Sequence, residues 1–281
     1  MQGCRTVIRD MTQQAVKLAA ATVDRLRPTR TGAVILIYHR VGRRTTLEVD
    51  LPTSLFDEQM AALAELGQVM TLDAALEWMC PTESSPMSAT KPPIVVTFDD
   101  GTDDLVDIAM PILERHAIPA TLYVATDFID RDISFPADGR PLSWTALGEM
   151  VSTGLITVGS HTHTHALLDR LAPENAANEI ATSSRLIEEH VGYSPAHFAY
   201  PKAVAPSSTV DRMIRDNYRS AALAGTRSNR QGYTDAHLLA RSPIQLGDGM
   251  RWFERKVAGG MAFEDDLRRT ANRWRYAKAT K

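Results

Sequence analysis

The sequence is poor in cysteine. Its 281 residues contain only Cys4 and Cys80, which lie far apart and form no Cys-x-x-Cys pair. Such a chain has neither a disulfide framework nor the paired thiolates of a structural zinc site. Any bound metal ion would therefore be held by nitrogen and oxygen ligands.

The sequence also lacks an excess of positive charge and long hydrophobic runs. The 31 Lys and Arg residues are offset by 34 Asp and Glu, a net charge of −3, so we expect no nucleic-acid partner. No run reaches the roughly 18 apolar residues that span a bilayer. The N-terminal run 18–23 is shorter and more polar than a signal-peptide core of about 7–15 residues. We therefore expect a cytoplasmic protein, with the inner membrane surface as one location and export left open.

No internal repeat is present, but short apolar segments alternate with segments of helical spacing. This alternation indicates right-handed βαβ units and an α/β fold with a parallel sheet, either doubly wound or closed into a barrel. Hydrophobic residues make up 44% of the chain, enough for one large core. About seven strands are expected, which favours the barrel; they are predicted at 33–38, 94–98, 122–125, 155–158, 198–200, 220–224 and 241–244.

Helical segments flank this core. We predict three parts: an N-terminal helical extension (1–30), the catalytic domain (31–262) and a basic C-terminal helix (263–281). The last segment carries Arg268, Arg269, Arg273, Arg275 and Lys278. It is either a solvated helix or a segment that contacts an anionic membrane or an acidic partner.

Two adjacent carboxylates, Asp99 and Asp100, follow the predicted strand 94–98 and precede Gly101. At the carboxyl end of a buried strand they are costly unless a cation or a proton compensates them. Their side chains diverge, so one could bind a metal ion while the other acts as a base. The alternative is a turn that caps the next helix.

Three alternating histidines, His161, His163 and His165, follow the predicted strand 155–158. The i, i+4 spacing of His161 and His165 is expected to place both imidazoles on one side of a helical turn, where they could bind a divalent metal. His163 would point elsewhere.

Two imidazoles and one carboxylate form a facial three-ligand site that leaves positions open for water and substrate. This site suits hydrolysis, although non-haem iron oxygenases use the same ligands. The second Asp favours hydrolysis because a free carboxylate can act as a general base. Zn²⁺ is the expected cofactor, and Co²⁺ or Ni²⁺ also fits such ligands.

These motifs resemble the polysaccharide deacetylase family, also called the NodB-homology family or carbohydrate esterase family 4. Residues 97–101 are similar to its first motif and 160–165 to its second. The resemblance implies a distorted (β/α) barrel over about residues 34–253. It further implies Asp99 as general base and Asp100, His161 and His165 as metal ligands.

Two family features differ in this sequence. The third motif often carries an Arg that orients the base, whereas residues 198–203 read Phe-Ala-Tyr-Pro-Lys-Ala. This segment resembles the poly-N-acetylglucosamine deacetylase branch, which implies that the backbone near Tyr200 and Pro201 holds the oxyanion. Lys202 and Ala203 replace the Tyr-Gly usual there.

The C-terminal Leu-x-x-His motif, which usually supplies the general acid, is also missing; residues 241–244 read Arg-Ser-Pro-Ile. Tyr38-His39-Arg40-Val41 matches an N-terminal segment of the same branch. The resemblance therefore makes His39 the expected acid, with a structural histidine as the alternative and His237 in reserve.

The predicted function is metal-dependent removal of N-acetyl groups from an amino-sugar-containing carbohydrate. One alternative keeps the site and changes the substrate to a small amide, a formamide or a lipid- or nucleotide-linked sugar. Another is a barrel that binds carbohydrate without catalysis, suggested by the absent Arg and by Lys202-Ala203.

Overall fold

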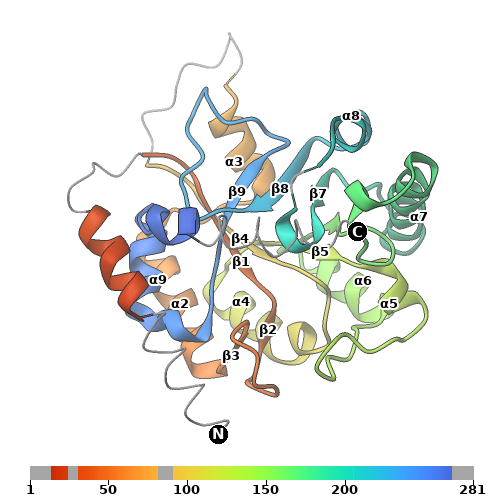
Figure 1. The fold of residues 1–281 in the computed structure, drawn as a ribbon. Coiled ribbons are helices and arrows are strands. Elements are labelled where there is room, and N and C mark those ends of the chain that lie inside the picture. Colours follow the sequence, from red (N-terminus) through yellow and green to blue (C-terminus); the bar gives the residue numbers. More distant parts are fainter. Residues whose placement is uncertain (1–13, 25–30, 82–90, 205, 268–281) are drawn as a thin grey trace, which may run out of the picture.

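A computed structural model of the protein describes residues 14–24, 31–81, 91–204 and 206–267. Within these residues, seven parallel strands close into a barrel in the order β1-β4-β5-β6-β7-β8-β9, which confirms the predicted architecture (Figure 1). The strands are β1 (Val34–Tyr38), β4 (Ile94–Phe98), β5 (Ala120–Val124), β6 (Ile156–Ser160), β7 (His197–Ala199), β8 (Ser220–Ala224) and β9 (Leu239–Pro243).

The first strands are apolar over their whole length because both of their faces are covered. Every residue of β1, β4 and β5 is buried, as expected for strands that have the barrel interior on one side and helices on the other. The closure runs through β1, whose Ile35 pairs with Arg241 of β9. The seam between β6 and β7 is the shortest, with one paired position, Ser160 and Phe198.

Helices surround the barrel (Figure 1). They are α2 (Thr53–Leu66), α3 (Leu72–Met79), α4 (Met110–His116), α5 (Thr126–Asp130), α6 (Trp144–Ser152), α7 (Pro173–Val191), α8 (Ser208–Asn217) and α9 (Gly249–Val257). Ser143, a residue type that favours the N-terminal cap of a helix, caps α6, because its hydroxyl accepts from the Ala146 amide at 3.1 Å. Gly67 and Gly192 end α2 and α7 in the left-handed conformation.

Some local predictions were wrong. In α7 the helical spacing of Ala177 with Ile180 and Ile187 predicts all three on the inner face, but Ala177 is exposed and Ala176 is buried in its place. A short parallel pair, β2 (Arg40–Val41) with β3 (Asp50–Leu51), was not anticipated, because two-residue strands carry no readable alternation. Before α4 the chain forms a π-helical turn, η1 (Leu105–Ala109).

The N-terminal extension packs on the barrel domain. Residues 14–24 are helical and lie beside α9 (Figure 1), where Ala20 and Ala21 form an apolar cluster with Trp252 and Met261. The Lys17 ammonium contacts the buried Asp248 carboxylate at 2.6 Å, and Lys256 of α9 contacts the same carboxylate at 2.8 Å. A buried ion-pair network thus fastens this helix to the segment after β9.

The described start of the predicted C-terminal helix, residues 262–267, is helical. The basic residues expected to contact a membrane, at 268–278, lie outside the described residues. No helix in the described part of the chain is both long and apolar enough to cross a membrane.

Candidate active site

The predicted site residues meet at the carboxyl end of the barrel, where active sites of (β/α) barrels lie. Asp99 follows β4, and its amide donates to the Tyr38 carbonyl at the end of β1 at 3.1 Å. Because Tyr38 and Phe98 are paired in register, the next residues, His39 and Asp99, leave neighbouring strands side by side.

Asp99 is held by an arginine from the last strand of the barrel. The Arg241 guanidinium of β9 donates to both carboxylate oxygens of Asp99, at 2.6 and 2.9 Å, and to the Thr97 hydroxyl at 3.1 Å. Asp99 and Arg241 are only 5% and 1% exposed. Burial alone would raise the pKa of Asp99, but the charge of Arg241, helped by His161 and His39, holds it well below its usual range. Asp99 is therefore a carboxylate with a fixed orientation.

Asp100 and Gly101 form a tight turn that separates the two carboxylates. Both have positive φ, 75° and 99°. At Gly101 a Cβ atom would also lie 3.3 Å from the Val124 side chain, so glycine fits both the conformation and the space. Adjacent acids thus take different surroundings: Asp99 contacts Arg241, and Asp100 faces His161 and His165.

His161 and His165 converge on Asp100, but not through a helical turn as predicted. Residues 161–165 form an irregular loop in which Thr162 and His165 have positive φ. The Ala166 amide closes this loop by donating to the Thr162 hydroxyl at 3.1 Å. The Nε2 atoms of His161 and His165 lie 3.8 and 3.6 Å from Asp100 Oδ1.

Both imidazoles are in the state that metal binding requires. His161 Nδ1 is 2.7 Å from the Ala199 carbonyl, an acceptor, so this nitrogen carries the proton and Nε2 keeps its lone pair. Burial lowers the pKa of both imidazoles, that of His165 to about 4. Neutral imidazoles and an ionised carboxylate are the donors a divalent ion needs.

Three candidate ligand atoms lie within 4.8 Å of one another, one each from Asp100, His161 and His165. This set fits the expected ion: three nitrogen and oxygen donors on one side, with a base beside them.

The other candidate histidines, His39, His163 and His237, differ in their surroundings. His39 is half-buried, and its Nδ1 is buried without a hydrogen-bond partner among the described residues. His163 turns away to the Thr126 hydroxyl, 3.0 Å from Nδ1, as predicted. His237 Nε2 lies 2.8 Å from the Tyr218 carbonyl, and the residue precedes β9 at the opposite end of the barrel. His237 is therefore remote from the site. His39 leaves β1 beside Asp99, whose carboxylate also lies 4.0 Å from His161 Nε2.

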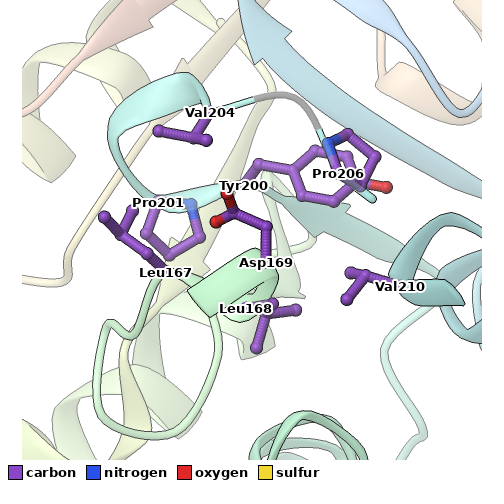
Figure 2. Close-up of a pocket in the computed structure, with 8 residues that line it drawn as sticks. All are labelled: Leu167, Leu168, Asp169, Tyr200, Pro201, Val204, Pro206 and Val210. Atoms are coloured by element: carbon purple, nitrogen blue, oxygen red, sulfur yellow. The ribbon is translucent and has the colours of Figure 1, made fainter. Parts of the chain in front are cut away.

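Tyr200 and Pro201 are not oxyanion donors. The Tyr200 amide donates to the Ala222 carbonyl at 3.0 Å, and proline has no N–H. Their side chains instead line a small pocket beside the barrel (Figure 2), with the other lining residues Leu167, Leu168, Asp169, Val204, Pro206 and Val210. Neither residue therefore offers a free backbone N–H to the site.

Sequence reasoning missed the role of Arg241. From the sequence, residues 241–244 are predicted only as a strand and as the segment that replaces the Leu-x-x-His motif. The available signal was a charged residue within a strand of a buried sheet, since such a charge requires a partner.

Comparisons with known proteins agree with this geometry. Residues 87–221 match the family model for polysaccharide deacetylase. YxkH of Bacillus subtilis (strain 168), a protein assigned to the polysaccharide deacetylases, is 25% identical over 215 residues, which cover 76% of this chain and 72% of that protein.

Two solved structures share the fold. IcaB from Ammonifex degensii superposes with a TM-score of 0.67 at 23% identity, covering 82% of this chain and 98% of that one. The Streptococcus pyogenes deacetylase PplD, in complex with acetate, gives a TM-score of 0.66 at 21% identity and covers 82% and 99%. Residues 87–221 of the chain thus belong to the polysaccharide deacetylase family.

Proposed function

We propose that the protein is a metal-dependent hydrolase that removes N-acetyl groups from an amino-sugar-containing carbohydrate. Membership of the polysaccharide deacetylase family supports the carbohydrate and the deacetylation. The observation that carries the metal-dependent chemistry is the convergence of Asp100, His161 and His165 beside the buried Asp99.

Asp100, His161 and His165 would hold the ion, and Zn²⁺ fits this donor set. A divalent ion there would polarise the acetyl carbonyl and make nearby water more acidic. Three protein ligands would leave coordination positions open for water and substrate.

Asp99 acts as the general base for the attacking water. Arg241 binds both of its oxygens in the free enzyme and keeps the carboxylate ionised and oriented. Arg241 is thus a positioning residue that takes the place of the arginine missing from the third motif.

The oxyanion needs a backbone donor near the loop after β7. The first free amide beyond Tyr200 and Pro201 is that of Lys202, which has no acceptor among the described residues. We assign the oxyanion contact to this amide.

His39 donates a proton to the departing amine. His39 leaves β1 next to Asp99, so both side chains could reach one acetamide group, the base toward the attacking water and the acid toward the departing amine. An amine leaves poorly without a proton, whereas a nitrophenolate leaves readily.

The experiment is a screen for released acetate or formate with protein of known metal content. Its substrates are acetylated chito-oligomers, small amides and formamides, and nitrophenyl acetate. Asp99→Asn is expected to lose at least about 10²-fold of turnover on every substrate while its metal content is unchanged. His39→Gln should lose similar activity on the amides but much less on the ester.

Release from small amides alone would favour the small-amide reading. Bound metal without hydrolysis of any substrate in the panel would refute the proposal and favour a carbohydrate-binding barrel.

A further inference from the structure

The loop that carries the two histidines of the site is held from outside by a carboxylate of α7. Glu179 Oε2 accepts hydrogen bonds from the backbone amides of His163 and Thr164, at 3.0 and 2.8 Å. Glu179 Oε1 accepts from the Thr164 hydroxyl at 2.8 Å. This half-buried carboxylate thus binds three donors of two consecutive residues, and those residues lie between His161 and His165.

These contacts account for the irregular backbone of residues 161–165. In a helical turn the amide of the last residue would donate to the carbonyl of the first. Here Thr162 has a positive φ of 67°, and the next two amides, those of His163 and Thr164, donate to the same oxygen. Successive amides arranged in this way form a concave anion-binding site, and the Glu179 carboxylate fills it. The negative charge therefore stabilises the loop against the helical alternative.

The loop also contacts α5. The His163 carbonyl accepts from the Asp127 amide at 2.8 Å, and the Thr162 carbonyl accepts from the Thr126 amide at 3.4 Å. These donors of α5 are neutral backbone groups, whereas α7 supplies a charged acceptor. Because hydrogen bonds to an ionised group are roughly twice as strong as neutral ones, we expect the contacts from α7 to fix the loop more firmly.

The position of the second histidine depends on this backbone. The His161 ring is oriented by the hydrogen bond of its Nδ1 to the Ala199 carbonyl, at 2.7 Å. The His165 ring contacts the His161 ring edge-on, with 4.9 Å between centroids, but no residue of the described part of the chain makes a hydrogen bond to it. His165 also has a positive φ of 59°. Its reach toward Asp100 is therefore set by the course of the loop rather than by a partner of the ring.

We propose that Glu179 is a positioning residue of the metal site, whose carboxylate fixes the loop so that the His165 imidazole is placed for coordination. The inference rests on the metal-dependent function proposed above. Outer partners of metal ligands typically contribute about 10- to 100-fold to metal affinity. Glu179 makes its contribution through the loop backbone and does not touch a ligand ring.

The test measures the Kd of the metal-free protein for Zn²⁺ by competition titration, and the visible absorption of the Co²⁺-loaded protein, which reports coordination geometry. Glu179→Met removes both acceptor oxygens, and we expect a Kd about 10- to 100-fold higher and an altered Co²⁺ spectrum. Glu179→Gln should raise the Kd by at most about 2-fold, because its oxygen can accept from both amides and its NH₂ group can donate to the Thr164 hydroxyl. Glu188→Met, at an exposed position of the same helix, is the matched control and should leave the Kd and the spectrum unchanged.

A double variant keeps the test decisive if Glu179→Met does not fold. Thr164→Val changes an exposed side chain and removes only its hydroxyl. In Glu179→Gln combined with Thr164→Val, the NH₂ group would face a methyl group and lose its acceptor. Each single variant should raise the Kd by at most about 2-fold, and the double variant by about 10-fold. A double variant whose Kd changes by no more than the product of the two single factors overturns the proposal.

The outcomes also separate this assignment from the proposed function. A purely structural role of Glu179 would lower the free energy of unfolding of Glu179→Met and leave its Kd and Co²⁺ spectrum at the native values; that result overturns the assignment alone. Weaker metal binding in Glu179→Met supports the assignment even if the native protein releases no acetate, and then only the proposed function fails. A native protein that binds neither ion overturns both.

Discussion

Removal of the Arg241 guanidinium should damage both stability and catalysis. In Arg241→Met the Asp99 carboxylate would lose two hydrogen bonds, of 2.6 and 2.9 Å, and its compensating charge. Breaking a fully buried pair by deleting one partner typically costs about 3–5 kcal/mol, because the remaining charge is left without compensation. We expect a loss of this size in the free energy of unfolding measured with urea at pH 7.

A double variant separates the pair from its parts. Asp99→Asn combined with Arg241→Met removes both charges, and similar replacements of buried pairs are often nearly neutral. The double variant should therefore be more stable than Arg241→Met alone, with a coupling energy of about 2–3 kcal/mol. Arg185→Met is the control, because Arg185 forms an exposed pair with Glu189 on α7 that is worth less than about 1 kcal/mol.

Activity adds a second readout. Arg241→Met should lower kcat/KM by at least about 10²-fold through a misplaced base, and Arg241→Lys by about 10-fold, because an ammonium keeps the charge but lacks the planar fork. The reasoning is refuted if the free energy of unfolding of Arg241→Met lies within about 1 kcal/mol of the native value. It is also refuted if the stability losses of the two single variants simply add in the double variant.

Three other changes test neighbouring features. His165→Ala should weaken metal binding by at least about 10²-fold in a competition titration, while the matched His163→Ala retains the metal; equal losses would contradict the ligand set. Asp248→Asn should cost about 3–5 kcal/mol at pH 7. Burial alone would raise the pKa of Asp248, but the two ammonium groups lower it. The stabilisation from its ionised carboxylate is therefore present above about pH 4 and is lost on further acidification. Urea denaturation at pH 7 and at pH 3 should show this loss in the native protein and not in Asp248→Asn. Ala203→Gly should raise the unfolding free energy by up to about 1 kcal/mol through relief of positive φ, and a loss of stability would show that the turn is not strained.

The strands were predictable because burial on both faces requires continuous apolar residues. β1, β4 and β8 begin and end within one residue of their predicted limits for this reason. The convergence of Asp100, His161 and His165 was predictable because each residue directly follows or closely trails a strand of a parallel sheet, and such positions meet at one end. Both predictions depend only on local sequence and on the rule that parallel strands share their direction.

Other features depend on contacts between distant segments, which no local pattern reveals. Lys17 lies in an Ala-rich helix and has the sequence context of a solvated lysine, yet its ammonium is buried against Asp248, 231 residues away. His161 and His165 have the spacing of a helical turn, but residues 161–165 form an irregular loop. The two imidazoles need only converge on Asp100, and more than one backbone conformation allows this. The Tyr200 amide is not free to bind an oxyanion, because it donates a hydrogen bond to the Ala222 carbonyl of β8, which lies alongside β7.

Arg241 shows how a barrel can replace a missing motif residue. The residue lies 142 positions from Asp99, but closure of the barrel brings β9 next to β1, and β1 next to β4. Its guanidinium also stacks over the Tyr123 ring of β5, with 4.9 Å between the guanidinium carbon and the ring centroid, so it lies in the barrel interior. Any strand whose side chain points inward at this level can supply a cation to Asp99. The absent third-motif arginine therefore does not indicate lost catalysis, and the argument for a non-catalytic barrel keeps only the Lys202-Ala203 replacement.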